Sequence, residues 1–431
     1  MVGLVDCDNF FCSCERVFRP DLAKTPLVVL SNNDGCVVAR SREVKAMGIP
    51  EGMPYYQMKE QYPDAGIVAF SSNYALYADM SARVISILRS EAPDVIQYSI
   101  DEAFLILDGM DNLDLHKWGE ELCRKVQKCT GMPVSLGIAP TNTLAKMASK
   151  YAKKYPGYNK CCVIENEEQR RKALSLFPVG DVWGIGRRIR RKLEYVGVNT
   201  AYDFASLPKE YVRRRFHVTG ERTWKELHGI PCIEIDGLDA VSKKTIVTSR
   251  SFPEMIRDLA DLRGHVANYA ARCALKLRRQ NSVCALVTAF IQSNHFREDL
   301  EQYDGSGTYS FTTPTNTTNE IVASAMTILE HIFRKGIFYK RAGVMVAGIS
   351  TANVIQPDLF EYDAERRKRF SEISAAIDKI NSRLGADTVM LGAQQYRERS
   401  EDGKSIKFVN AIRRAMKSPD YSTSLGALTV S

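Results

Sequence analysis

Two neighbouring acidic residues lie inside an apolar run of the sequence. The stretch YSIDEAFLIL, residues 98–107, carries Asp101 and Glu102 within a segment that reads as a buried strand. Acidic residues are depleted in strands, and burying an unpaired carboxylate is costly. We therefore expect this pair either to lie at the exposed end of a strand or to be held by positive charge.

A third acidic residue ends the first apolar segment. Asp6 closes MVGLVD, which reads as a short strand. Carboxylates from separate strand ends suit Mg²⁺, and two such ions about 3.5–4 Å apart can activate an attacking hydroxyl and stabilise the leaving oxygens of a phosphoryl transfer. On spacing alone, acids that cap turns or pair with Arg are the commoner interpretation. Because neighbours in a strand point to opposite faces, Asp101 and Glu102 share one site only if the strand is kinked, or begins, at Asp101.

Two aromatic residues follow the first acid. Phe10 and Phe11 stand in DCDNFFCSC. A hydrocarbon edge beside a nucleotide sugar offers no hydrogen bond to a 2′-hydroxyl and could exclude it. Two Phe residues taken alone are more often part of a core.

Basic residues occur in two places that could hold a triphosphate. Lys and Arg bind phosphate oxygens as point charges or forks, although a solvated helix face is the usual role of such residues. The candidates are Arg40, Arg42, Lys45, Lys146, Lys150, Lys153 and Lys154.

The segment VWGIGRRIRRKLEYVGV, residues 182–198, is typical of a helix-hairpin-helix. Gly184, Ile185 and Gly186 precede a predicted helix that starts with Arg187 and Arg188. Glycine lets a backbone approach a phosphate, and the amides at a helix N-terminus favour an anion. Such a hairpin grips the DNA backbone without reading bases. A plain tight turn is the alternative.

A short motif follows the last predicted folded unit. In QPDLF, residues 356–360, Gln356, Leu359 and Phe360 have the spacing that one helical turn presents on one side. A short anchor of this kind fits an apolar groove of a partner. Five residues recur by chance, but a place outside the folded units leaves the motif accessible.

Length and composition limit the classes of protein to which the chain can belong. With 431 residues the chain is too long for one core, so we expect two to four domains. Its 45% apolar and 26% charged residues are ordinary for a soluble globular protein, and its net charge of +8 permits a polyanionic partner. No stretch resembles a membrane span or a signal peptide. The 11 scattered cysteines favour a reducing cytosol and buried thiols over a zinc site.

Strand and helix patterns alternate through the first 165 residues, which predicts an α/β or α+β fold. Helices are predicted at 71–93, 114–130 and 142–154. Short Arg-rich helices follow from residue 166. A second α/β unit then contains a strand at 283–292, a polar Thr/Asn-rich loop with a low-complexity stretch at 312–319, and a helix near 319–334. Another amphipathic helix is predicted near 364–384.

Together these residues resemble the Y-family translesion DNA polymerases, and within them the UmuC group, the catalytic subunit of bacterial DNA polymerase V. The similarity rests on DCDNFF, FRPDLAKTPLVVLSNNDGCVVARS, FSSNYALYADMS, YSIDEAF, SLGIAPTNTLAKMASKYAKK and VWGIGRR, which follow the family's order over residues 1–190. It continues more weakly towards residue 420, with SPDYST near the end.

This resemblance implies a multidomain α/β (α+β) fold of the right-hand polymerase type. It has a palm, fingers, a small helical thumb with the helix-hairpin-helix, and an α/β little finger. The implied boundaries are 1–165 for the palm with fingers inserted near 19–75, 166–235 for the thumb, 236–245 for a linker, 246–350 for the little finger and 351–431 for a tail that contains 356–360.

The resemblance also assigns roles to single residues. Asp6, Asp101 and Glu102 become the catalytic metal ligands for two Mg²⁺ ions, for which Mn²⁺ can substitute, and Cys7 contributes its backbone carbonyl. Phe11 takes the steric-gate position beside Phe10. Lys45 and Lys153 contact the incoming triphosphate, with Arg42 where many relatives carry Tyr and with Lys154 competing for the role of Lys153. Residues 184–188 contact DNA, and Gln356, Leu359 and Phe360 form a sliding-clamp motif.

The implied activity is low-fidelity, template-directed DNA synthesis across damaged templates in the SOS response of a bacterium. The implied partners are primer-template DNA, dNTP, the bacterial sliding clamp, a UmuD′-like subunit and a recombinase filament, in the cytoplasm at the nucleoid and without a membrane. Two alternatives stay open. The chain could be a non-catalytic DNA-binding accessory protein that recruits the clamp and a partner, or a two-metal nuclease.

Overall fold

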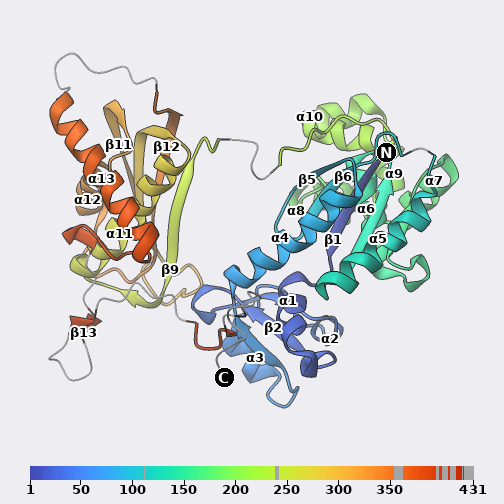
Figure 1. The fold of residues 1–431 in the computed structure, drawn as a ribbon, viewed down its shortest axis with the longest axis horizontal. Helices are drawn as coiled ribbons and strands as arrows, with labels where there is room; N and C mark the ends of the chain where they lie inside the picture. The colour runs from blue at the N-terminus through green and yellow to red at the C-terminus, as the bar shows by residue number, and fades with distance from the viewer. Residues whose placement is uncertain are drawn as a thin grey trace. The chain divides into compact units, whose positions relative to one another are not determined.

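The computed structural model describes residues 1–110, 112–237, 242–353, 363–394, 398–399, 406–407, 414–419 and 421. Two compact units make up the chain (Figure 1). The first contains Met1–Val241 together with Arg414–Ser431, and the second contains Ser242–Arg413.

The first unit is built around a five-stranded sheet. Its strand order is β5 (Asp94–Gln97), β6 (Glu102–Ile106), β1 (Val2–Cys7), β7 (Val134–Ala139) and β8 (Cys161–Val163). The central strand β1 runs antiparallel to both β6 and β7, and β7 runs parallel to β8. The strand predicted at the N-terminus is therefore the centre of the sheet.

Helices cover both faces of this sheet (Figure 1). Helix α6 (Asn142–Lys154) packs on the face formed by Leu4 and Phe104, and α4 (Tyr74–Glu91) and α5 (Leu115–Thr130) pack on the face of Val5 and Leu105. Side chains alternate between faces along a strand. Asp6 and Glu102, each two residues from a residue on the α6 face, therefore point towards α6.

The apolar run 98–107 is not one strand. The amides of Tyr98 and Ser99 both donate to the carbonyl of Glu102 at 3.0 Å, which closes a tight turn between β5 and β6. The Ser99 hydroxyl accepts from the amides of Asp101 and Glu102 at 3.2 and 3.0 Å. The strand thus begins at Glu102, directly after Asp101, which removes the geometric objection to a shared site.

A three-stranded sheet follows the first helix, α1 (Phe10–Phe18). Its order is β3 (Val37–Arg40), β2 (Leu27–Leu30) and β4 (Val68–Ser71), with β2 antiparallel to β3 and parallel to β4. A turn joins β2 to β3, and in it Asn33 and Asp34 adopt φ values of 63° and 52°, which these two residue types tolerate. Helices α2 (Arg42–Ala46) and α3 (Tyr55–Gln61) lie between β3 and β4 in the chain.

Short helices complete the first unit. They are α7 (Glu167–Leu176), α8 (Arg187–Tyr195), α9 (Ala201–Ala205) and α10 (Lys209–Leu227). Their apolar residues share a core with α6. The buried Glu226 joins α10 to the start of α6, since its carboxylate accepts from the amide of Thr143 at 2.9 Å.

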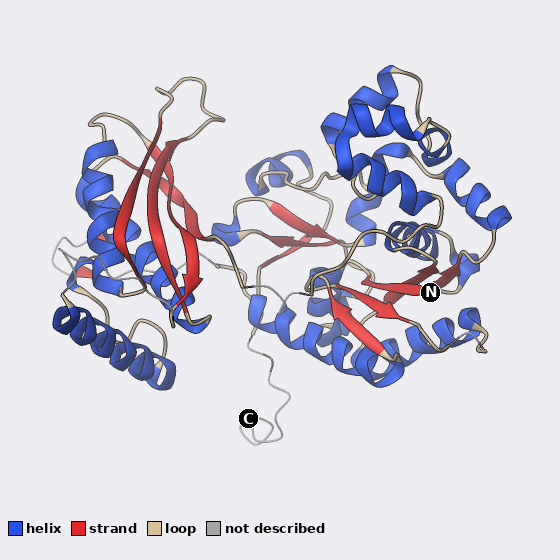
Figure 2. Ribbon diagram, turned by 90° about the horizontal axis from the view of Figure 1, so that it is seen from above, coloured by secondary structure: helices blue, strands red, loops and turns tan. Residues whose placement is uncertain are grey.

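The second unit is an antiparallel sheet with helices on one face (Figure 2). The strand order is β11 (Asp304–Thr315), β10 (Ser282–Ser293), β12 (Tyr339–Thr351) and β9 (Ile246–Ile256), covered by α11 (Leu259–Arg279) and α12 (Thr318–Ile332). Helix α13 (Ala364–Leu384) is joined to α11 by Arg278, whose Nε lies 2.7 Å from Asp378 Oδ2. Two-residue strands β13 (Glu398–Arg399) and β14 (Ile406–Lys407) pair with each other.

The prediction of a loop between the strand at 283–292 and the helix near 319–334 is wrong for Asp304–Thr315, because these residues form strand β11. Among the described strands, β11 lies at the edge of its sheet and pairs with β10 alone. An edge strand tolerates polar residues, and the Thr and Ser side chains therefore do not prevent the pairing. Among the described residues, none of the helices is both long and apolar enough to span a membrane.

Candidate active site

Three carboxylates meet at one end of the five-stranded sheet. Asp6 and Glu102 are directly opposed partners in the β1–β6 ladder. The amide of Cys7 donates to the carbonyl of Asp101 at 2.9 Å, which places the third acid beside the other two. All three acids are partly exposed, and the Ser99 hydroxyl fixes Asp101 by donating to its Oδ1 at 2.6 Å.

Helix α6 presents two lysines to these carboxylates. Lys146 Nζ lies 3.1 Å from Glu102 Oε2, and Lys153 Nζ lies 2.8 Å from Asp6 Oδ1. A spacing of seven residues is two helical turns, so both ammonium groups extend from one side of α6. The Lys146 ammonium also lies over the rings of Tyr98 and Trp183, at 4.6 and 5.2 Å from their centroids.

The electrostatics of the pair formed by Asp6 and Lys153 reflect its burial. Burial raises the pKa of Asp6, Lys153 opposes that rise, and the neighbouring acids reinforce it. Burial alone would lower the pKa of Lys153, but Asp6 and Asp8 outweigh it and raise that pKa overall. The lysine therefore stays charged and favours the ionised form of Asp6.

The donor chemistry of this site fits a divalent cation. Carboxylate oxygens are the ligands that Mg²⁺ takes, and the backbone brings three of them to one sheet end. Within the described ranges, no group of three His, Cys, Asp or Glu side chains is arranged around one point as a metal site. Lys146 and Lys153 hold two of the carboxylates instead, so a cation would take over the positive charge that these lysines supply.

A cavity of about 200 Å³ adjoins the acids. Asp6 and Glu102 line it from the sheet, and Lys146 and Lys150 line it from α6. Lys150 Nζ donates to the carbonyl of Asp181 at 2.9 Å on the opposite wall. The cavity is thus acidic on one wall and basic on another.

The two predicted aromatic residues have different surroundings. Asn9 starts α1 in the left-handed conformation with φ 49°, which Asn tolerates better than most residues. Phe10 is 4% exposed and belongs to the core, so its predicted place in a nucleotide pocket is not supported. Phe11 is partly exposed and stacks on Tyr77 with ring centroids 4.4 Å apart.

The residues predicted to bind the triphosphate also differ in their surroundings. Lys45 Nζ donates to Asn9 Oδ1 at 2.6 Å, and burial and then the charge of Lys153 lower its pKa. Arg42 is exposed at the start of α2. Lys154 is exposed with its ammonium over the Tyr155 ring at 5.3 Å, so Lys153 rather than Lys154 faces the acids.

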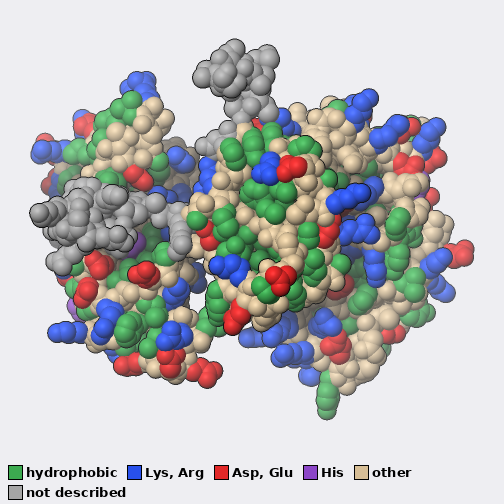
Figure 3. Space-filling view, turned by 90° about the horizontal axis from the view of Figure 1, so that it is seen from below, with side chains coloured by type: hydrophobic (Ala, Val, Ile, Leu, Met, Phe, Trp, Pro, Cys, Tyr) green, Lys and Arg blue, Asp and Glu red, His purple; other side chains and the backbone are tan. Residues whose placement is uncertain are grey.

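The predicted hairpin lies before α8. Gly184 has φ 92°, and a Cβ there would lie 2.4 Å from Thr223 Oγ1, so this position requires glycine. Ile185 is buried, and Gly186 is the N-cap of α8. Arg187 and Arg188 are exposed on the first turn of α8. Figure 3 shows Lys and Arg side chains at several places on the visible surface of the first unit, with Asp and Glu side chains among them.

Comparison with known proteins identifies the family. The model of the impB/mucB/samB family matches residues 5–150, and that of its C-terminal domain matches residues 243–359. A domain of unknown function, DUF4113, matches residues 371–430. The chain is 41% identical to the protein UmuC of Salmonella typhimurium over 98% of both chains. The chain belongs to the impB/mucB/samB family.

Other members of this family and more distant relatives extend the comparison. The chain is 40% identical to ImpB of Salmonella typhimurium over 88% of this chain and 90% of that protein. It is 25% identical to DNA polymerase IV 1 of Bacillus subtilis over 92% and 94% of the two chains. These relatives place this member of the impB/mucB/samB family in the UmuC group of Y-family DNA polymerases, as the resemblance implied.

A solved structure agrees with the fold of this family member. A Y-family DNA polymerase chimera of Dbh and Dpo4 matches with a TM-score of 0.64 at 20% identity, covering 81% of this chain and 99% of that chain. The multidomain α/β fold is thereby confirmed.

Sequence reasoning missed one buried acid in this family member. Asp8 is 6% exposed, and its Oδ2 lies 2.6 Å from Lys160 Nζ while its Oδ1 lies 3.5 Å from Lys153 Nζ. It thereby shares Lys153 with Asp6. Both acids contact the same lysine, a relation that only the packing of α6 reveals.

The predicted motif with Gln356, Leu359 and Phe360 lies outside the described residues.

Proposed function

We propose that this chain synthesises DNA on a template, with low fidelity, across lesions that arise in DNA damage. The observation that carries the proposal is the pairing of Asp6 with Glu102 beside Asp101, opposite the lysines of α6. Acids of this type at a strand end, with cations facing them, suit phosphoryl transfer. The primer 3′-hydroxyl attacks the α-phosphorus of a dNTP, and pyrophosphate leaves.

The domain roles follow the same proposal. Residues 1–165 form the palm, with fingers inserted near 19–75 that include the three-stranded sheet. Residues 166–235 form the thumb, 236–245 a linker and 246–350 the little finger, followed by the tail 351–431. In this division the acids, Phe11 and α6 belong to the palm, and Arg42 and Lys45 belong to the fingers.

Asp6, Asp101 and Glu102 would hold two Mg²⁺ ions, with Mn²⁺ as a substitute and with help from the Cys7 carbonyl. Such ions lower the pKa of the attacking hydroxyl and neutralise charge on the leaving group. The chain itself orients Asp101 through Ser99 and favours the ionised form of Asp6 through Lys153. Positioning and charge stabilisation are therefore its main contributions.

The nucleotide pocket is proposed between α1, α2 and α6. Lys45, Lys153 and Arg42 hold the triphosphate oxygens as positive charges. Phe11 offers a hydrocarbon edge to the sugar and excludes a ribose 2′-hydroxyl. Lys153 and Lys45 are already close enough for the charge of Lys153 to lower the pKa of Lys45. An anion between the two ammonium groups would relieve their repulsion.

The hairpin before α8 is proposed to contact the DNA backbone. Gly186 leaves the first amides of α8 open, and Arg187 and Arg188 add charge there.

Gln356, Leu359 and Phe360 are proposed to bind the sliding clamp. Replacing Leu359 and Phe360 with Ala should abolish clamp binding and leave distributive synthesis intact, and unchanged clamp affinity would refute this assignment. A UmuD′-like subunit and a recombinase filament are the further proposed partners, at the nucleoid of a bacterial cytoplasm.

One assay separates this function from the two alternatives. A labelled primer-template is incubated with Mg²⁺, with and without dNTPs. Lengthening of the primer only with dNTPs supports synthesis. Shortening without dNTPs would indicate a nuclease, and binding without either change, even with clamp and partner present, would indicate a DNA-binding accessory protein.

A further inference from the structure

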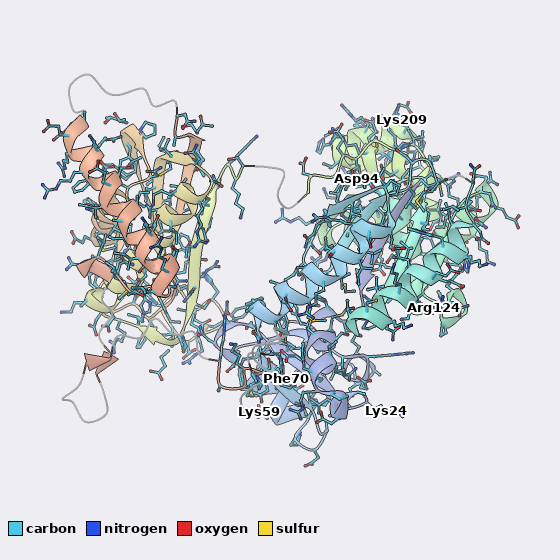
Figure 4. All side chains as sticks on the ribbon, in the orientation of Figure 1. Lys24, Lys59, Phe70, Asp94, Arg124 and Lys209 are labelled. Atoms are coloured by element: carbon cyan, nitrogen blue, oxygen red, sulfur yellow. The ribbon has the colours of Figure 1, made fainter. Side chains whose placement is uncertain are left out.

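The last described part of the chain lies against the edge of the three-stranded sheet. Residues 414–419 and Tyr421, here called the docked segment, group with the first unit although the second unit precedes them in the chain. The Ser71 amide donates to the Met416 carbonyl at 3.0 Å, and the Met416 amide donates to Ser71 Oγ at 3.0 Å. Strand β4, which ends at Ser71, is an edge strand, and Phe70 on it is labelled in Figure 4. The docked segment therefore continues an open edge as an added strand does.

Side chains anchor the docked segment at three points. The ring of Tyr421 stacks on Phe18 of α1, with centroids 4.4 Å apart and planes 6° apart. Met416 packs on the apolar residues of the three-stranded sheet. Ser418 is 4% exposed, and its Oγ accepts from Asn73 Nδ2 at 2.9 Å. Two apolar contacts and a buried polar one make this a specific contact.

Ser418 also faces a buried carboxylate. Glu15 on α1 is 0% exposed, and the Tyr77 hydroxyl donates to its Oε1 at 2.8 Å. Burial raises the pKa of Glu15, and the nearby hydroxyls of Tyr77 and Ser418 oppose that rise. A buried carboxylate is costly unless donors satisfy it. The docked segment thus places a hydroxyl beside Glu15, whose Oε2 has no hydrogen-bond partner among the described residues.

Asn73, which donates to Ser418, and Glu15, which Ser418 faces, both lead to the nucleotide pocket. Asn73 caps α4, since its Oδ1 accepts from the Leu76 amide at 3.4 Å. Tyr77, one turn further along α4, is fully buried, and its ring stacks on Phe11 at 4.4 Å. Glu15 and α4 therefore set where Tyr77 lies, and Tyr77 supports the face of Phe11.

We propose that the docked segment is a positioning element of the nucleotide pocket. Ser418 accepts a hydrogen bond from Asn73 and faces Glu15, and these two residues fix Tyr77 behind the Phe11 ring that excludes a ribose 2′-hydroxyl. This inference rests on the proposed function, in which Phe11 is the sugar gate. It assigns a role to the end of the region matched as a domain of unknown function, residues 371–430.

Displacement of the Phe11 ring should affect ribonucleotide insertion far more than deoxyribonucleotide insertion. A deoxyribose needs no exclusion, so a displaced Phe11 ring leaves dNTP insertion nearly unchanged. A ribose meets the ring, so displacement raises the kcat/KM for rNTP insertion. Loosening the docked segment should therefore change the ratio of the two rates rather than both rates together.

The test uses the full chain, under conditions in which the wild type extends a primer. The kcat/KM for one dNTP and for the matching rNTP is measured for wild type, Phe11→Ala, Ser418→Ala and Tyr421→Ala. Ser418→Ala and Tyr421→Ala should raise rNTP insertion about three- to tenfold, the range set by one lost hydrogen bond. Phe11→Ala should raise it further. Ser418→Thr, which keeps a hydroxyl, should restore discrimination, and Ser175→Ala on the exposed face of α7 is the matched control.

A second measurement reports docking without any reaction. Hydrogen–deuterium exchange of the peptide that contains the Ser71 amide should be faster in Tyr421→Ala than in wild type, because the acceptor on Met416 is lost. Thermal unfolding of each variant shows that the remaining chain is folded.

Each outcome has one meaning. Unchanged sugar discrimination in Phe11→Ala would refute the gate and with it the proposed pocket. Relaxed discrimination in Phe11→Ala, with wild-type discrimination in Ser418→Ala and Tyr421→Ala, would overturn the role of the docked segment alone. Unchanged exchange at Ser71 in Tyr421→Ala would overturn its docking.

Discussion

Lys153 on α6 lies 2.8 Å from Asp6 at the end of β1, although the two residues are 147 positions apart in the chain. The contact exists because α6 follows β7, the neighbour of β1, and packs back across the sheet face to which Asp6 points. One lysine thereby balances the acid that we propose as a metal ligand, and the same lysine is the one that we propose to bind the triphosphate.

Replacing Lys153 with Ala should therefore weaken both roles. We expect the KM for dNTP to rise by about tenfold or more, the usual effect of losing a hydrogen bond to a charged group. Lys154→Ala is the matched control, because its ammonium lies over the Tyr155 ring. Steady-state primer extension measures both variants, and equal effects of the two substitutions would contradict the assignment of Lys153.

The same substitution predicts a change in pH dependence. Lys153 lowers the pKa of Asp6 against the opposing effect of burial, so its removal raises that pKa further. Asp6 must be ionised to accept a cation, and a raised pKa requires a higher pH for ionisation. The acid limb of kcat/KM should move to higher pH in Lys153→Ala and stay in place in Lys154→Ala. A shift to lower pH would show that another group governs this limb.

The hairpin glycines form a matched pair for a structural test. Gly184→Ala places a Cβ 2.4 Å from Thr223 Oγ1 at φ 92°, whereas Gly186→Ala meets nothing within 4 Å. We expect Gly184→Ala to destabilise the chain by about 1–2 kcal/mol, the cost of a left-handed residue, and to weaken DNA binding. Gly186→Ala should keep its stability. Thermal unfolding and DNA-binding titrations check this, and equal stability of both variants would show that the turn does not require glycine at position 184.

Stability of the second unit should fall in mild acid because of His265. Burial, and then the charge of Arg250, lower its pKa from 6.5 to about 4. The unfolded chain therefore binds a proton between these values that the folded chain refuses, so stability is lost as pH falls through this range. Between about pH 7 and pH 5 this amounts to about 2 kcal/mol. Hydrogen exchange of α11 should show the loss in wild type and a smaller loss in His265→Phe, and equal losses would exclude His265 as the cause.

Local patterns predicted most elements of the fold. The helix predicted at 142–154 matches α6, and that predicted at 114–130 matches α5 within one residue, because apolar residues recur at helical spacing there and Thr141 and Asp114 cap the two starts. The sequence does not indicate the turn before Glu102, because the segment lacks Gly and Pro. Hydrogen bonds to the Ser99 hydroxyl stabilise this turn instead.

Contacts between distant segments could not be predicted. The sequence contains the acids and lysines of the site, but the pairing of Lys146 with Glu102 depends on how α6 crosses the sheet. The contact of Ser418 with Asn73 joins residues 345 positions apart, and no local pattern indicates it. Phe10 and Phe11 are alike in type, and only packing decides which of them is buried.

The central claim is that Asp101 belongs to a site of DNA synthesis. The direct measurement is primer extension with Mg²⁺ and dNTPs by wild type, Asp101→Asn and Asp108→Asn, with and without the clamp and a UmuD′-like partner. Asp108 is the control because its side chain is 83% exposed beyond the end of β6. We expect Asp101→Asn to lose at least about a hundredfold of the rate while Asp108→Asn keeps it, and DNA binding to persist in both. Extension by Asp101→Asn at the wild-type rate, or none by wild type under any of these conditions while DNA still binds, would contradict the account.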